Sequence, residues 1–270
     1  MRSNAARAVH LLSSAALATM LALTVAGCKT TGDDTTGSIS AAPVQRSEAD
    51  WQRAVEVWGS RYRENPSDAD AAIGYARALR ATGQRAQAVA VLEQASIRNP
   101  NNKQLLGAFG RALADAGQYP QALDALSRAH TPDNPDWRIL NAQGAVLDQM
   151  DRHAEAQRYY DSALKIVPDE PSVLSNLGLS YALMKDLKSA ESTLRRAVAQ
   201  PGAGPKVRQN LALVVGLQGR FADAEQIASA DLPPDDAAAN VGYLRQMLAQ
   251  QGDWKKKGNK PIVLSPDAGS

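Results

Sequence analysis

The chain carries a single thiol. Cys28 is the only cysteine among the 270 residues, so no disulfide can form within the chain. A thiol can act as a nucleophile, a metal ligand or an attachment point. The residues before it form a short basic start, an apolar run and an end in the small residues Ala26 and Gly27. This order is typical of a secretory signal peptide over 1–27, which is removed from the mature protein.

The stretch Val25-Ala26-Gly27-Cys28 resembles the processing motif of bacterial lipoproteins. In that family, the cysteine sulfur receives a diacylglyceryl group and the chain is cut just before the cysteine. The resemblance implies that Cys28 is the lipidated first residue of the mature protein, because several acyl chains anchor a protein durably. The alternative is an ordinary signal peptide with a chance cysteine. Lys29 stands where inner-membrane lipoproteins commonly have aspartate, which favours the periplasmic face of the outer membrane in a Gram-negative bacterium.

No other set of side chains predicts catalysis or metal binding. The histidines of the mature chain, His130 and His153, have no partner at metal-ligand spacing. The sequence has no GxSxG elbow, no phosphate-binding glycine loop and no HExxH motif. We therefore expect no enzyme activity, no metal, no cofactor and no small-molecule substrate. The enzymatic alternative would require a deep polar pocket with convergent ionisable groups.

The net charge argues against a nucleic-acid partner. The whole chain has 30 basic and 28 acidic residues. Removing the signal peptide takes away Arg2 and Arg7, which leaves 30 − 2 = 28 basic residues and an equal number of acidic ones. A mature chain that is neutral by count has no overall basic field to attract nucleic acid.

Small residues recur every 34 positions along the chain. One column is Ala76, Gly110, Gly144, Gly178 and Ala212, and a second is Ala88, Ala122, Ala156, Ala190 and Ala224. This period is typical of the tetratricopeptide repeat (TPR), in which each repeat is a helix–turn–helix unit. We expect the small residues where paired helices approach too closely for large side chains. The pattern predicts an all-α TPR solenoid of about five repeats with capping helices at both ends.

The same pattern predicts the organisation of the mature chain. A flexible tether rich in glycine, serine and threonine follows the lipidated cysteine over 28–47. The solenoid covers 48–252, and the tail 253–270 lacks the pattern. Within the solenoid we predict repeats at 69–102, 103–136, 137–170, 171–204 and 205–237, with capping helices at 48–66 and 238–251.

In repeat folds of this kind, function usually resides on the concave surface formed by the first helix of each repeat. The early repeats carry charged residues there, namely Arg77, Arg80, Arg111 and Asp115. The middle repeat carries Arg138, Asn141, Asp148 and Gln149. The last two repeats combine polar residues with leucines. We predict a peptide-binding groove lined by Asn141, Asn176, Leu179, Leu183, Gln209, Asn210, Leu213 and Leu217.

Asn176 and Asn210 occupy equivalent positions one repeat apart. An amide offers a donor and an acceptor together, so the pair can bind a peptide backbone whatever its side chains. The leucines one turn later can hold apolar side chains of an extended or helical segment. Two alternatives stay open. The asparagines can instead bond neighbouring helices, and the C-terminal helix or tail can cover the leucines.

Three segments carry a more specific resemblance, namely NAQGAVLDQM (141–150), LSNLGLSYAL (174–183) and RQNLALVVGLQGRFADAE (208–225). With the VAGC motif, the tether and five repeats, they resemble the TadD family of TPR lipoproteins from tight-adherence (Flp pilus) loci, over nearly the whole chain. The resemblance implies an outer-membrane factor for pilus assembly that binds the secretin as a pilotin and has no catalytic residues. A different interaction protein is the alternative, a periplasmic scaffold that organises peptidoglycan enzymes or outer-membrane protein assembly.

Overall fold

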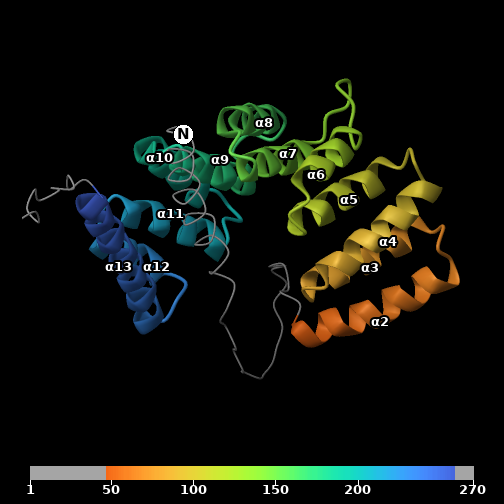
Figure 1. The fold of residues 1–270 in the computed structure, drawn as a ribbon, viewed down its shortest axis with the longest axis horizontal. Helices are drawn as coiled ribbons and strands as arrows, with labels where there is room; N and C mark the ends of the chain where they lie inside the picture. Colours follow the sequence, from red (N-terminus) through yellow and green to blue (C-terminus); the bar gives the residue numbers. More distant parts are fainter. Residues whose placement is uncertain (1–46, 259–270) are drawn as a thin grey trace, which may run out of the picture. The chain divides into compact units, whose positions relative to one another are not determined.

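The computed structural model describes residues 47–258, and this part of the chain consists of helices joined by loops, without a strand. Figure 1 shows the helices following one another as antiparallel pairs. The helices are α2 (Glu48–Glu64), α3 (Ala69–Ala81), α4 (Arg85–Arg98), α5 (Lys103–Asp115), α6 (Tyr119–Ser127), α7 (Trp137–Gln149), α8 (His153–Ile166), α9 (Pro171–Leu183), α10 (Leu187–Val198), α11 (Pro205–Leu217), α12 (Phe221–Ala228) and α13 (Pro234–Gly258). None of these helices is long and apolar enough to cross a membrane.

The helices α3 to α12 form five pairs, and the first helix of each pair begins at the residue where its predicted repeat begins. A flanking helix packs at each end, α2 against α3 and α13 against α11 and α12. Three ends differ from the sequence prediction, and one of them is the end of α13, which runs to Gly258 instead of 251 and so extends into the predicted tail 253–270. Helix α2 stops at Glu64 because Pro66 disfavours a helical conformation in the residue before it. Helix α13 begins at Pro234 instead of 238, since proline is well suited to the first helical position.

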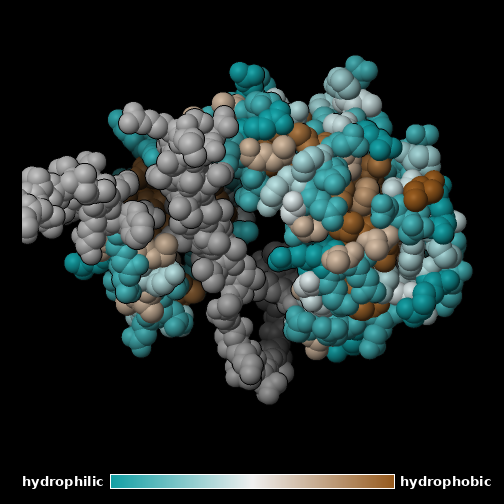
Figure 2. Space-filling model, in the orientation of Figure 1, coloured by the Kyte–Doolittle hydropathy of each residue, from teal (hydrophilic) through white to brown (hydrophobic). Residues whose placement is uncertain are grey.

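The structure divides the chain into two compact units with a boundary between Ile166 and Val167. The first contains α2 to α8, and the second contains α9 to α13. The sequence had predicted one uninterrupted solenoid. Each unit has a hydrophobic core of its own, which includes Leu79 and Leu105 in the first unit and Leu194 and Val214 in the second. The face visible in Figure 2 is largely hydrophilic, with hydrophobic residues in patches over the helices.

The recurring small residues face large ones across each helix pair. At three glycines of the first column, an added Cβ would lie within 2.6 Å of an apolar side chain, too close for any real contact. The facing pairs are Gly110 with Leu126, Gly144 with Tyr160 and Gly178 with Leu194. The small column therefore reflects close approach of the two helices of a repeat, as the period predicted.

The turn inside each pair has the same backbone geometry. Its left-handed residues, with φ between 58° and 82°, are Gly83, Gly117, Asp151, Lys185 and Gly219. The residue after each of them donates its N–H to a carbonyl five positions back, as from Gln84 to Leu79 at 2.8 Å and from Asp186 to Tyr181 at 3.0 Å. This helix-ending motif satisfies carbonyls that the helix leaves unpaired. The turns thus repeat every 34 residues as the helices do.

Candidate functional site

The predicted groove residues divide between the two units. Asn141 lies on α7 of the first unit, where it is half-buried. Helices α9 and α11, which pack against each other in the second unit, carry the remaining residues, namely Asn176, Leu179, Leu183, Gln209, Asn210, Leu213 and Leu217. Seven of the eight predicted groove residues therefore lie on two neighbouring helices of the second unit. Cys28 lies outside the described residues, and its lipidation stays a prediction.

The amide of Asn210 joins the two helices of this surface. Its Nδ2 donates to Oγ of Ser175 at 2.9 Å, and Ser175 is buried. The contact uses one of the two N–H donors of the amide and fixes the direction of the group. Bonding between neighbouring helices, one of the two alternatives weighed for these asparagines, therefore occurs at Asn210. Asn176 is half-buried on α9.

The leucines of the surface are only partly accessible. Leu179 is buried, with 8% of its surface exposed, while Leu183, Leu213 and Leu217 are half-buried. Helix α13 covers a neighbouring part of α11, where Leu244 lies so close to Gly216 that an added Cβ would approach it to 2.5 Å. The second unit thus offers a mixed surface of amides and half-buried leucines beside the capping helix.

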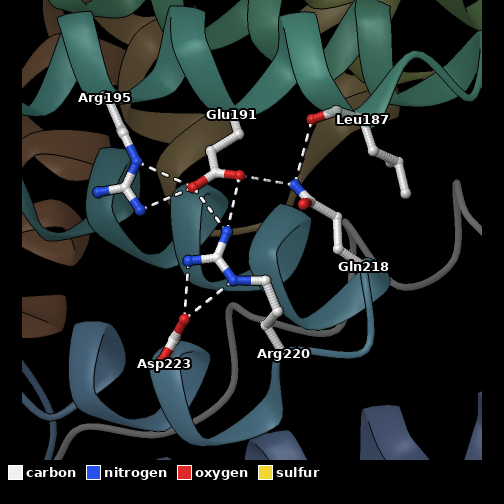
Figure 3. Close-up of polar contacts among 6 residues, drawn as sticks. All are labelled: Leu187, Glu191, Arg195, Gln218, Arg220 and Asp223. Carbon is white, nitrogen blue, oxygen red and sulfur yellow. Dashed lines mark hydrogen bonds and ion pairs between the residues drawn. The ribbon is translucent and has the colours of Figure 1, made fainter.

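A polar cluster joins α10 to the turn between α11 and α12 (Figure 3). Glu191 on α10 accepts hydrogen bonds from Arg195 at 2.7 and 2.9 Å, from Gln218 at 2.9 Å and from Arg220 at 3.0 Å. Arg220 also donates to Asp223 on α12 at 2.7 Å. Gln218 donates in addition to the backbone carbonyl of Leu187 at 3.3 Å. The two arginines and two carboxylates therefore join α10 to the start of α12, and Gln218 adds the end of α11.

The electrostatics of this cluster favour the charged forms of Glu191 and Arg220. Burial alone would raise the pKa of Glu191, but the hydrogen bonds from Gln218, Arg195 and Arg220 outweigh it and lower the pKa to about 2. The hydrogen bond to Asp223 and those to Glu191 raise the pKa of Arg220. The shallow open depression beside the cluster is lined by Arg195, Arg220, Asp223, Gln226 and Ile227. Because its charges are mutually paired, we interpret the cluster as a structural clasp.

A second buried polar cluster lies in the first unit. Asp148, at the end of α7, accepts a hydrogen bond from the hydroxyl of Tyr160 at 2.8 Å and lies 2.9 Å from Nδ1 of His153. Burial raises the pKa of Tyr160 well above its ordinary value, and the nearby Asp148 carboxylate raises it further. Tyr160 is 1% exposed. A phenol so protected from solvent holds its proton and fixes the carboxylate, so the cluster connects α7 to α8.

The sequence predicts no metal-ligand partner for His153, and the partner that the structure gives it is the carboxylate of Asp148. The sequence signal that could have found this cluster is Tyr160, which stands at the position of Leu92, Leu126 and Leu194 in three other repeats and needs a partner for its hydroxyl. Nε2 of His130 lies 3.2 Å from Oε1 of the buried Gln143. Within residues 47–258, no group of three potential ligands has the arrangement of a metal site.

The charged residues predicted for the early repeats do come together. Nε of Arg80 on α3 donates to Asp115 on α5 at 2.5 Å. Arg111, also on α5, lies within electrostatic reach of both of them and of Asp136 and Arg138 at the start of α7. These side chains lie on, or at the start of, the first helices of three successive repeats in the first unit.

Comparison with known proteins identifies the fold. Tetratricopeptide-repeat family profiles match residues 46–112 and 141–206. No curated protein sequence matches the chain. The solved structure of PilW, a widely conserved type IV pilus biogenesis factor, is similar with a TM-score of 0.62 at 15% identity, over 72% of this chain and 91% of that one.

Two further structures are similar at the same level. PilF of Pseudomonas aeruginosa gives a TM-score of 0.52 at 18% identity, over 74% of this chain and 85% of that one. The Cut9–Hcn1 hetero-tetramer of APC/C gives 0.58 at 16% identity, over 73% of this chain and 40% of that one. Together with the five helix pairs, these matches establish an all-α TPR fold. It is a fold that mediates protein–protein interaction.

Proposed function

We propose that this protein is a lipid-anchored, non-enzymatic assembly factor of the Flp (tight-adherence) pilus, of the TadD type, that binds the pilus secretin as a pilotin does. The observation that carries the proposal is the likeness of the fold to the pilus biogenesis factor PilW over most of both chains. The likeness to PilF and the resemblance of three sequence segments to TadD proteins point the same way.

In this proposal, the two ends of the chain have separate tasks. Lipidated Cys28 holds the protein at the periplasmic face of the outer membrane, and the tether after it gives the helical units reach. The surface of α9 and α11 then receives a segment of the secretin. Asn210 is oriented by Ser175, which reduces the entropy lost when its amide binds a peptide backbone. The half-buried leucines beside it take up apolar side chains of the segment.

The decisive experiment removes the amides of this surface. We expect the double variant Asn176→Ala and Asn210→Ala to recover at least tenfold less secretin in a pull-down from solubilised membranes. A matched control replaces Asn101 and Asn240, which are exposed asparagines outside α9 and α11, and should recover as much secretin as the wild type. Equal recovery by both double variants would remove the groove from the mechanism, and recovery of peptidoglycan enzymes without secretin would overturn the pilus assignment.

The anchor is tested separately. A Cys28→Ser variant should not incorporate radiolabelled palmitate and should leave the membrane fraction. Normal membrane association of this variant would contradict lipidation at Cys28. A Lys29→Asp variant that moves to the inner membrane would support the outer-membrane location of the wild type.

A further inference from the structure

The first unit carries a row of arginines on the first helices of its repeats. Arg77 and Arg80 lie on α3, Arg111 lies on α5, and Arg138 lies on α7. Helix α3 contacts α5, and α5 contacts α7, so the row crosses three neighbouring helices. We call these four residues the arginine row. It lies in the first unit and shares no residue with the groove on α9 and α11.

Three members of the row have partners that leave much of the guanidinium available. Arg77 lies over the ring of Trp51 at 5.9 Å, and Arg138 lies over Trp137 at 4.5 Å. Both arginines are exposed. Arg80 uses its Nε to bond Asp115 at 2.5 Å. A guanidinium has five N–H donors, and stacking on a ring uses none of them.

Arg111 differs from the others because it is half-buried and has neither a hydrogen bond nor an ion pair with any residue in the described part of the chain. Burial lowers the pKa of Arg111, and the charge of Arg80 lowers it further, against the opposing effects of Asp136 and Asp115. Removing a charged group from water without an acceptor is costly. Among the described residues, no side chain or carbonyl therefore accepts a hydrogen bond from this half-buried cation.

We propose that the arginine row binds an acidic, extended segment of a partner protein, with one carboxylate seated on Arg111. The planar guanidinium matches a carboxylate in a two-bond arrangement, which would supply the acceptor that Arg111 lacks. Neighbouring helices pack about 8–10 Å apart, and an extended peptide rises about 3.3 Å per residue. The row therefore fits acidic residues at about every third position.

Two carboxylates that act on the arginine row, Asp115 and Asp136, select against other anions. Asp115 is hydrogen-bonded to Arg80, and both Asp115 and Asp136 act electrostatically on Arg111, so two anions accompany the four cations. A nucleic acid or an anionic bilayer presents closely spaced phosphates and would meet both aspartates. A peptide with spaced carboxylates can avoid them, because neutral residues then face the aspartates. This charge pattern favours a protein segment over a polyanion.

Binding of defined peptides to the full mature chain tests the proposal. The probe is a fluorescein-labelled twelve-residue peptide of serine and alanine with glutamate at every third position, and its counterpart has glutamine at the same positions. By fluorescence anisotropy, we expect the glutamate peptide to bind and the glutamine peptide to bind at least tenfold more weakly. Arg111→Gln should weaken binding of the glutamate peptide at least tenfold, and Arg85→Gln, an exposed arginine on α4, should change it less than twofold.

Thermal stability separates a binding role for Arg111 from a structural one. If the residue serves a ligand, Arg111→Gln should keep or raise Tm in the free protein by up to a few degrees, since it removes a buried unpaired charge. Loss of binding together with a large fall in Tm would instead assign Arg111 to the fold. Arg138 is exposed, so the Arg138→Gln variant tests binding without disturbing the fold. It should weaken binding of the glutamate peptide at least threefold.

Two outcomes would overturn the proposal outright. One is equal binding of the glutamate and glutamine peptides, or of the wild type and Arg111→Gln. The other is tighter binding to phosphatidylglycerol vesicles or to a single-stranded oligonucleotide than to the glutamate peptide. The pilus proposal is unaffected by either result, because its test uses variants of Asn176 and Asn210 on α9 and α11.

Discussion

At the residue scale, the turn inside each helix pair needs one residue in the left-handed backbone conformation. In two of the five repeats that residue is not glycine. Asp151 and Lys185 stand at the left-handed position that glycine occupies in the other three turns. A residue with a Cβ pays about 1 kcal/mol for this conformation, whereas glycine adopts it freely. The middle of the chain therefore stores a small backbone strain at these two sites.

Replacing Lys185 by glycine should relieve that strain. We expect the free energy of unfolding to rise by about 0.5–1 kcal/mol, measured by urea denaturation of the mature chain. The control Arg158→Gly, at an exposed position inside α8, should lower it by about 1 kcal/mol, because glycine is a poor helix former. A fall in stability on Lys185→Gly would show that the lysine side chain contributes more than the strain costs.

The buried hydroxyl of Tyr160 makes a second prediction at this scale. Tyr160→Phe keeps the ring against Gly144 and removes only the bond to Asp148. The carboxylate then loses a buried donor, and we expect the free energy of unfolding to fall by about 1–2 kcal/mol. Tyr159→Phe, at the neighbouring half-buried position, should change it by less than about 0.5 kcal/mol. Equal effects of both variants in urea denaturation would contradict a special role for the Asp148 bond.

At the scale of the elements, the clasp around Glu191 links folding of the second unit to pH. The folded pKa of about 2 lies below the ordinary value of 4.5. The unfolded chain therefore binds a proton more readily, and the stabilisation is complete above about pH 4.5. It is lost as the pH falls from about 4.5 towards 2.

Glu191→Gln should remove this pH-dependent contribution. Near pH 7 we expect it to lower the free energy of unfolding by about 2 kcal/mol, because charge-assisted bonds to two arginines are lost. The difference between variant and wild type should shrink as the pH is lowered to about 2.5. Urea denaturation monitored by circular dichroism at pH 7, 4 and 2.5 provides the measurement. A difference that stays constant over this range would mean that the Glu191 charge does not stabilise the fold.

The starts of the helices could be predicted from the sequence, but most side-chain bonds between helices could not. Helix starts were predictable because the period of small residues and the prolines that open α9 and α11 act locally. The sequence placed Arg80 and Asp115 on neighbouring first helices, but the bond between them came from the structure. The bonds of Asp148 to Tyr160 and of Glu191 to Arg220 were not predictable, because they depend on side-chain directions between helices. The repeat period is equally regular on both sides of Ile166 and so gave no sign of the boundary between the units.

At the scale of the whole molecule, two compact units with separate cores imply separate unfolding. A chain with one continuous core would melt in a single cooperative step, whereas each unit here closes its own hydrophobic cluster. Differential scanning calorimetry of the mature chain should resolve two transitions. Glu191→Gln should lower only the one that belongs to the second unit, and Tyr160→Phe only the other. A single transition shifted by both variants would show that the units fold as one.

The close contact between Gly144 and Tyr160 has a consequence for the history of the chain. An added methyl group at Gly144 would collide with the Tyr160 ring at 2.5 Å, so neither residue can change size alone without loss of packing. A smaller residue in place of Tyr160 would leave a cavity, and a larger residue in place of Gly144 would fill that cavity. Among related sequences, the two positions should therefore change together, with a larger residue at one accompanied by a smaller residue at the other. The same correlated substitution is expected for the facing pairs Gly110 with Leu126 and Gly178 with Leu194.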